Sequence, residues 1–214
     1  MSTKRRKKPA YRPHRVPRQA RARTTYDSIV AAAQRLLGKH GYAAVTTNHI
    51  ADTAGVAIGS VYEYFPDKDS IVAEVARRTV QEILDDIARA LFSAPPTDPA
   101  AALRAWVHAM FVAVGSRRDL VRVLWREVPF LWDLDEIREL PTRMLALAKS
   151  ARLPTSAVAH IANLEATTWL LTVMVSQAVI TSTVERPPEL SEEELEATLV
   201  HMLAALLLPH VQSV

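Results

Sequence analysis

The chain has 214 residues, of which 49% are hydrophobic and none is cysteine. A chain of this length and composition can bury one medium domain, or a small domain and a larger one. The absence of cysteine excludes disulfides, thiolate metal sites and thiol redox chemistry.

Positive charge is concentrated in the N-terminal third. Residues 1–70 contain 13 Lys/Arg and 5 Asp/Glu, whereas residues 71–214 contain 13 and 18. Residues 1–23 hold ten basic residues and no acid, so we expect a flexible basic arm. This asymmetry indicates contact with a polyanion. A disordered solubilising arm and a cleaved transit peptide are the alternative interpretations.

Two short helices are predicted after a first helix over residues 24–40, which ends at Gly41. Residues 46–65 read TTNHIADTAGVAIGSVYEYF. Thr46 or Thr47 caps the first of these helices, and Gly55 ends it in the left-handed conformation. The second runs from Ile58 to Tyr64. Helices joined by a short glycine-bearing turn predict a helix-turn-helix over residues 24–70.

The remainder, residues 71–214, is predicted to be a larger helical domain. It contains one glycine, and its prolines separate segments of helix length. Apolar residues recur every three or four positions in residues 69–93 and 191–208. The segment SEEEL at residue 191 is typical of a capped helix start. We therefore expect an all-α protein of about nine helices.

The exposed side of the second short helix favours DNA binding. Gly59 and Ser60 let the backbone approach a partner, and Tyr62, Tyr64 and Lys68 can hold phosphates. A helix of this kind fits a DNA major groove. Each residue alone is also compatible with simple packing, but the set beside a basic arm favours a nucleic-acid site.

These residues resemble the DNA-binding domain of the TetR family of bacterial transcriptional regulators. The resemblance rests on HGY at residues 40–42 and on VTTNHIADTAGVAIGSVYEYFPDKDSI at residues 45–71. It implies contacts to the DNA backbone from Thr47, Ser60, Tyr62, Tyr64 and Lys68, and contacts to base edges from Asn48, Ala57, Ile58, Gly59 and Glu63. Ala57 and Ile58 depart from the family pattern, where polar residues are frequent, which leaves base specificity open.

The arm is expected to lie along the duplex or to enter its minor groove. Its arginines nearest to the helix-turn-helix include Arg21 and Arg23, which we assign to the DNA site. Each phosphate that the arm neutralises steepens the salt dependence of binding by roughly one log–log unit.

A homodimer is predicted from the C-terminal half. Residues 153–184 contain one formally charged side chain, Glu165, and residues 191–208 are rich in leucine. A helix of that composition buries one face in its own core and another against a partner. We expect a two-fold dimer through residues 155–184 and 190–208, and hence a palindromic operator. The alternative is a monomer with residues 153–184 at its centre.

An effector site in this domain is implied by the family resemblance. Large aromatic residues and methionines suit an apolar pocket, and a few polar groups can orient a ligand in it. The predicted ligand is an apolar or aromatic small molecule that releases a repressor from its operator. The candidate residues are Trp106, Met110, Phe111, Trp125, Trp132, Met144, Glu165, Trp169 and Gln177.

Other functions find less support in the sequence. The histidines have no tight ligand spacing and phosphate-binding or nucleophile motifs are missing, so we expect no enzyme, metal or cofactor. The apolar run of residues 169–180 is too short to span a bilayer, which indicates a cytoplasmic protein. A non-specific architectural DNA-binding protein and a helical adaptor for another protein are the alternatives to a regulator.

Overall fold

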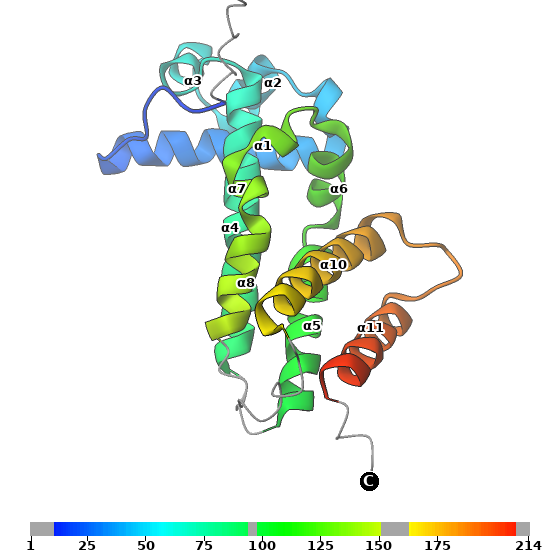
Figure 1. Ribbon diagram of the computed structural model, residues 1–214. Helices are drawn as coiled ribbons and strands as arrows, with labels where there is room; N and C mark the ends of the chain where they lie inside the picture. Colours follow the sequence, from blue (N-terminus) through cyan, green and yellow to red (C-terminus); the bar gives the residue numbers. More distant parts are fainter. Residues whose placement is uncertain (1–10, 94–97, 151–162, 209–214) are drawn as a thin grey trace, which may run out of the picture. The chain divides into compact units, whose positions relative to one another are not determined.

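The computed structural model describes residues 11–93, 98–150 and 163–208, which form helices and turns (Figure 1). No strand occurs in these ranges, which confirms the predicted all-α class. The helices are α1 (Ala20–Ala44), α2 (Thr47–Ala54), α3 (Ile58–Tyr64), α4 (Lys68–Ser93), α5 (Pro99–Gly115), α6 (Arg118–Glu127), the 3-10 turn η1 (Leu131–Asp133), α7 (Asp135–Arg138), α8 (Leu140–Ser150), α10 (Leu164–Glu185) and α11 (Glu192–Leu207).

The ends of the helices follow local sequence chemistry. Ser191 caps α11, because its hydroxyl accepts the Glu194 N–H at 3.1 Å while the Glu194 carboxylate accepts the Ser191 N–H at 2.7 Å. The bond from the Ser191 backbone holds the pKa of Glu194 below its ordinary value. Asp98 caps α5, whose first residue is Pro99. The predicted serine cap is therefore confirmed.

Helix α1 differs from its predicted extent at both ends. It begins at Ala20, four residues before the expected start, and it continues to Ala44. Gly41, where we expected the helix to stop, is a break within it, with φ 78° and ψ 169°. Residues 20–23 of the expected arm thus belong to the helix.

The chain divides into two compact units, of which the first comprises residues up to Thr79 together with Val123–Leu134. Its core centres on Tyr26 of α1, which is 1% exposed. The Tyr26 ring stacks on Phe65 at 4.9 Å and meets Tyr64 edge-on at 5.7 Å. Apolar residues of α1, α2, α3 and the start of α4 complete the core: Ile29, Val30, Leu37, Ile50, Val61, Ile71 and Val72.

The second unit comprises Val80–Arg122 and the chain from Asp135 onward. Within it α5 packs against α10 and α11, and α10 packs against α8 (Figure 1). Phe111 and Val107 of α5, Val175 and Val179 of α10 and Leu203 of α11 lie in one buried cluster. Arg117 joins this unit's part of α4 to the end of α5, because its guanidinium contacts Glu82 at 3.3 Å and Asp86 at 2.8 Å.

Helix α10 is less buried than its composition suggests. Glu165–Glu185 is long and apolar enough to cross a membrane by length and composition alone, and 22% of its most apolar window is buried. The apolar stretch is therefore longer than residues 169–180, the run that the sequence predicts to be too short to span a bilayer. Threonines, serines and Gln177 interrupt it throughout, and such groups are costly to place in a lipid core.

Candidate nucleic-acid interface

Helices α2 and α3 form the predicted helix-turn-helix. Thr46 is the cap of α2, since its hydroxyl accepts the His49 N–H at 3.2 Å. Gly55 follows α2 with φ 68° and ψ 33°, which confirms the predicted left-handed residue. The next residue, Val56, donates its N–H to the Ala51 carbonyl at 3.0 Å. This pair of features closes the C-terminus of α2 and turns the chain into α3.

The exposed side of α2 and α3 carries most of the predicted DNA contacts. The hydroxyls of Thr47 in α2 and Tyr62 in α3 are hydrogen-bonded to each other at 3.1 Å. Tyr62 is 49% exposed and Ile58 is 38% exposed. Asn48, Ala57, Gly59 and Glu63 are also exposed, whereas Ser60 is half-buried. Hydroxyls, small residues and an aromatic ring therefore share one surface.

Tyr64 does not belong to this surface, contrary to our expectation. It is 4% exposed and its ring packs against Tyr26 in the core. The reason is helical geometry, because residues two apart in a helix point to opposite sides and Tyr62 takes the exposed one. Val61 and Tyr64, three residues apart, are both buried.

Lys68 lies at the start of α4, where the structure gives it partners within the protein. Its Nζ donates to the Tyr42 carbonyl at 3.1 Å and stands 4.0 Å from the centre of the Tyr42 ring. The Tyr42 hydroxyl in turn donates to Asp69 at 2.7 Å. Burial, and then this bond to Asp69, raise the pKa of Tyr42 well above its ordinary value. The charge of Lys68 is thus held beside the turn after Gly41.

Residues 11–19, which we name the strap, were expected to be flexible but pack on this unit. The Tyr11 carbonyl accepts from Arg77 at 2.6 Å, and the His14 N–H donates to the Tyr64 carbonyl at 2.7 Å. Arg15 forms an ion pair with Glu63 of α3, and Pro17 is buried. The sequence signal for this packing is the presence of Tyr11, Pro13 and Pro17 among the basic residues of this stretch.

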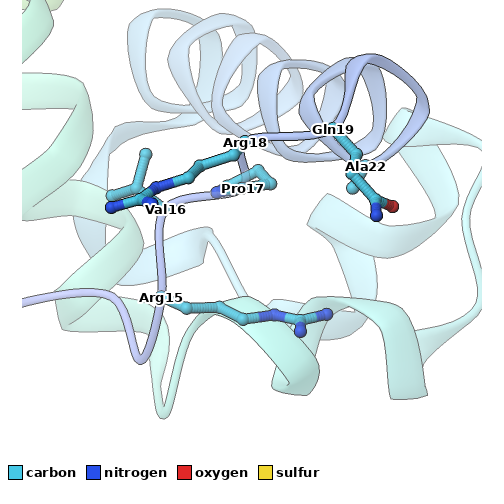
Figure 2. Close-up of a pocket in the computed structure, with 6 residues that line it drawn as sticks. All are labelled: Arg15, Val16, Pro17, Arg18, Gln19 and Ala22. Carbon is cyan, nitrogen blue, oxygen red and sulfur yellow. The ribbon is translucent and has the colours of Figure 1, made fainter.

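The strap and the start of α1 line an open hollow of about 300 Å³ (Figure 2). Figure 2 shows the Arg15 and Arg18 side chains extending in opposite directions from the strap backbone. Arg21 and Arg23, both assigned to the DNA site, are exposed in the first turn of α1. The predicted cationic groups therefore sit on ordered backbone, which lowers the entropy lost when they bind a partner.

The segment Val123–Leu134 belongs to the same unit and contacts the turn at Gly41. The Glu127 carboxylate accepts the Tyr42 N–H at 2.8 Å. Phe130 stacks on Tyr11 at 4.2 Å and meets Tyr42 edge-on at 6.3 Å. Sequence reasoning missed these contacts, since they join residues that are 85 or more positions apart.

The predicted effector residues are divided between the two units. Trp125 and Trp132 lie in the first unit, where their rings meet edge-on at 4.5 Å. The other seven lie in the second unit: Met110, Phe111 and Met144 are buried, Trp106 is half-buried, and Glu165, Trp169 and Gln177 are exposed. The predicted set thus does not form one continuous lining within the second unit.

The predicted dimer segments are partly described. Residues 155–162 lie outside the described residues, and the remainder corresponds to α10 and α11. Large apolar side chains of these helices are exposed: Trp169, Leu170, Met174, Met202 and Leu206, with exposed fractions between 45% and 63%.

Comparison with known proteins identifies the N-terminal domain. Residues 29–75 match the family described as bacterial regulatory proteins, tetR family. The chain is 31% identical over 121 residues to the HTH-type transcriptional regulator TtgR of Pseudomonas putida, an alignment that covers 55% of this chain and 57% of that protein. It is 30% identical over 117 residues to the HTH-type transcriptional repressor KstR2 of Mycolicibacterium smegmatis, with 55% and 56% covered. The chain therefore matches a little over half of the length of these relatives.

Solved structures extend the likeness of the fold to most of the chain. The fatty acid degradation regulator FadR from Bacillus halodurans is 22% identical with a TM-score of 0.61, and the match covers 88% of this chain and 96% of that one. A TetR-like transcriptional regulator from Rhodococcus sp. RHA1 is 18% identical with a TM-score of 0.62, with 90% and 98% covered. The helix-turn-helix geometry and the family match agree that residues 29–75 are a DNA-binding domain of the tetR type, and the solved structures show that the fold of TetR-like regulators extends over most of the chain.

Proposed function

We propose that this protein is a sequence-specific DNA-binding transcriptional regulator that contacts a duplex through α2 and α3. The observation that carries the proposal is the meeting of the Thr47 and Tyr62 hydroxyls, 3.1 Å apart, beside an exposed glycine. Each hydroxyl has one proton, and both can donate to the oxygens of one phosphate when their mutual hydrogen bond is exchanged for bonds to DNA. The short helix α3 then enters the major groove and presents Ile58 to the base edges.

Gly59 supports a close approach of DNA. A Cβ built on Gly59 meets no atom of the described residues within 4 Å. Packing inside the protein therefore does not require a glycine here, in contrast to Gly41, where a Cβ falls 2.6 Å from Glu127. The fold does not require glycine at this position, so the absence of a side chain is consistent with a partner that comes close to the backbone of α3.

The regulator acts as a two-fold homodimer through α10 and α11 in this proposal. Trp169, Leu170 and Met174 of α10 and Met202 and Leu206 of α11 expose an apolar surface, and apolar patches of this kind mark protein interfaces. A second copy is favoured over a membrane because α10 also carries hydroxyl groups and Gln177, which are costly to place in a lipid core. A two-fold dimer presents two copies of α3, and its operator is then an approximate palindrome.

An apolar or aromatic small molecule is the proposed effector, bound within the helices of the second unit. The Nε1 of Trp106 and the hydroxyls of Ser176 and Thr183 are buried with no hydrogen-bond partner in the described ranges. Buried polar groups normally have such partners, so these atoms are candidates to orient a ligand. The effector changes operator affinity only to the extent that it binds the two states of the protein differently.

Selection of bound duplexes from fragmented genomic DNA tests the proposal. The wild-type protein and Tyr62→Ala are used side by side, and the recovered sites are retested at two salt concentrations. We expect one approximate palindrome, bound by the wild type and lost in Tyr62→Ala. Recovery of DNA without a shared site would instead support a non-specific architectural protein that binds through charge.

A further inference from the structure

Glu63 is the only formally charged residue of α3, and it stands on the side that the proposed function turns toward DNA. A carboxylate at that position is repelled by the phosphates of a duplex. The structure shows what offsets this charge: the guanidinium of Arg15 pairs with Glu63 across 48 residues of sequence. The acid of the recognition helix is therefore neutralised by a residue of the strap.

The position of Arg15 is fixed by contacts on both sides of it. On one side the His14 N–H is bonded to the Tyr64 carbonyl at the end of α3, 2.7 Å away. On the other side Pro17 is buried. The Arg15 guanidinium also stands 5.5 Å from the centre of the Tyr64 ring, within the range of a cation–π contact. The backbone of the strap thus places this one arginine beside this one carboxylate.

The ion pair between Arg15 and Glu63 is not explained by a contribution to the stability of the fold. The Arg15 and Glu63 side chains are 57% and 51% exposed, and exposed ion pairs contribute little to folding because water screens them. Both side chains nevertheless lie at the surface that carries Tyr62 and the exposed residues of α3. An exposed pair at a binding surface affects association more than folding.

We propose that Arg15 is a positioning residue of the DNA site, which acts by neutralising Glu63 so that α3 can approach the duplex. This inference rests on the proposed function and deepens it. One nitrogen of the guanidinium is used on Glu63, and the Arg15 side chain is 57% exposed. Its other donors can therefore reach a phosphate that flanks the groove. The pair binds DNA as a unit in which Arg15 serves both the carboxylate and the phosphate.

A double-mutant cycle measures this coupling. Dissociation constants are measured for the duplex recovered by selection, at two salt concentrations, with wild type, Arg15→Ala, Glu63→Gln and the double variant. Arg15→Ala should weaken binding on the order of tenfold in the wild-type background. In the Glu63→Gln background the same substitution should cost only about threefold or less, because no carboxylate is left to compensate. Glu63→Gln alone should bind as tightly as wild type or more tightly.

Arg18→Ala is the matched control, because Arg18 is an exposed arginine of the same strap whose side chain extends in the opposite direction to that of Arg15 (Figure 2). Arg18→Ala should weaken DNA binding by the same factor in the wild-type and Glu63→Gln backgrounds. Arg15→Lys keeps the charge and should retain most of the affinity, and Arg15→Ala should unfold at the wild-type temperature. Equal costs of Arg15→Ala in both backgrounds, with wild-type binding intact, would overturn the inference alone. A wild-type protein that prefers no duplex would overturn the proposed function and the inference together.

Discussion

Two glycines with positive φ in the first unit respond differently to substitution by alanine. Gly41 has φ 78° and ψ 169°, and a Cβ built on it lies 2.6 Å from Oε2 of Glu127. Gly55 has φ 68° and ψ 33°, and its Cβ meets no described atom within 4 Å. Alanine is strained by the backbone at both positions, but only at Gly41 does it also collide with a side chain.

The magnitudes follow from these geometries. Alanine in the left-handed conformation of Gly55 costs about 1–2 kcal/mol. The backbone region of Gly41 is accessible almost only to glycine and costs about 1–3 kcal/mol. The Glu127 carboxylate must also move away, and the Tyr42 N–H then loses its acceptor, which adds about 1 kcal/mol. We therefore expect Gly41→Ala to lower the free energy of unfolding by about 2–4 kcal/mol.

Urea unfolding followed by far-ultraviolet circular dichroism measures the difference, since a change in midpoint at constant slope reports stability. The melting temperature should fall by about 2–4 °C for each kcal/mol in a chain of this size. In a Glu127→Ala background the collision is absent, so the cost of Gly41→Ala should fall by about 1 kcal/mol. Equal costs for Gly41→Ala and Gly55→Ala, or a cost at Gly41 that Glu127→Ala leaves unchanged, would refute the reasoning.

Three further predictions concern the site, the titration of a tyrosine and the dimer. Tyr62→Phe removes the hydroxyl that meets Thr47 and should weaken operator binding by about tenfold or more while the unfolding midpoint stays unchanged; equal affinities by fluorescence anisotropy would exclude a role for this hydroxyl. Because the pKa of Tyr42 is raised in the folded state, its contribution to stability is complete below the unfolded pKa of about 10 and is lost as pH rises further. Urea midpoints at about pH 9 and pH 11 should therefore diverge less in Tyr42→Phe than in wild type, and an identical pH dependence would contradict this. Met174→Glu places a charge on the exposed face of α10 and should give monomers in sedimentation, whereas Phe92→Glu, at an equally exposed apolar residue of α4, should not; a Met174→Glu dimer would rule out this interface.

The helix-turn-helix was predictable because its signals are local. A threonine cap, a glycine in the left-handed conformation and a proline after α3 each depend on a few neighbouring residues. The same local reasoning is wrong at Tyr64, because the closeness of Tyr62 and Tyr64 in sequence suggests that both lie on one exposed surface. The helical repeat places Tyr62 and Tyr64 on opposite sides, and only Tyr62 is exposed.

The strap and the tryptophans show that contacts between residues distant in sequence could not be predicted from the sequence. The charge of the strap predicts a flexible arm, but its backbone bonds to Tyr64, 50 positions away, and Arg77 anchors the carbonyl of Tyr11. Trp125 and Trp132 follow Trp106 closely in sequence, yet tertiary contacts place them in the first unit. Contacts between distant residues are set by the packing of whole helices, which no short stretch of sequence specifies.

The central claim is that α2 and α3 read a DNA sequence, and a ratio of two affinities tests it most directly. Dissociation constants are measured at two salt concentrations for the recovered duplex and for a scrambled duplex of equal length and composition. We predict at least about a thousandfold preference for the recovered duplex, with a large preference still present at the higher salt. A ratio close to one, with both affinities falling together as salt rises, would show a charge-driven binder and contradict the account.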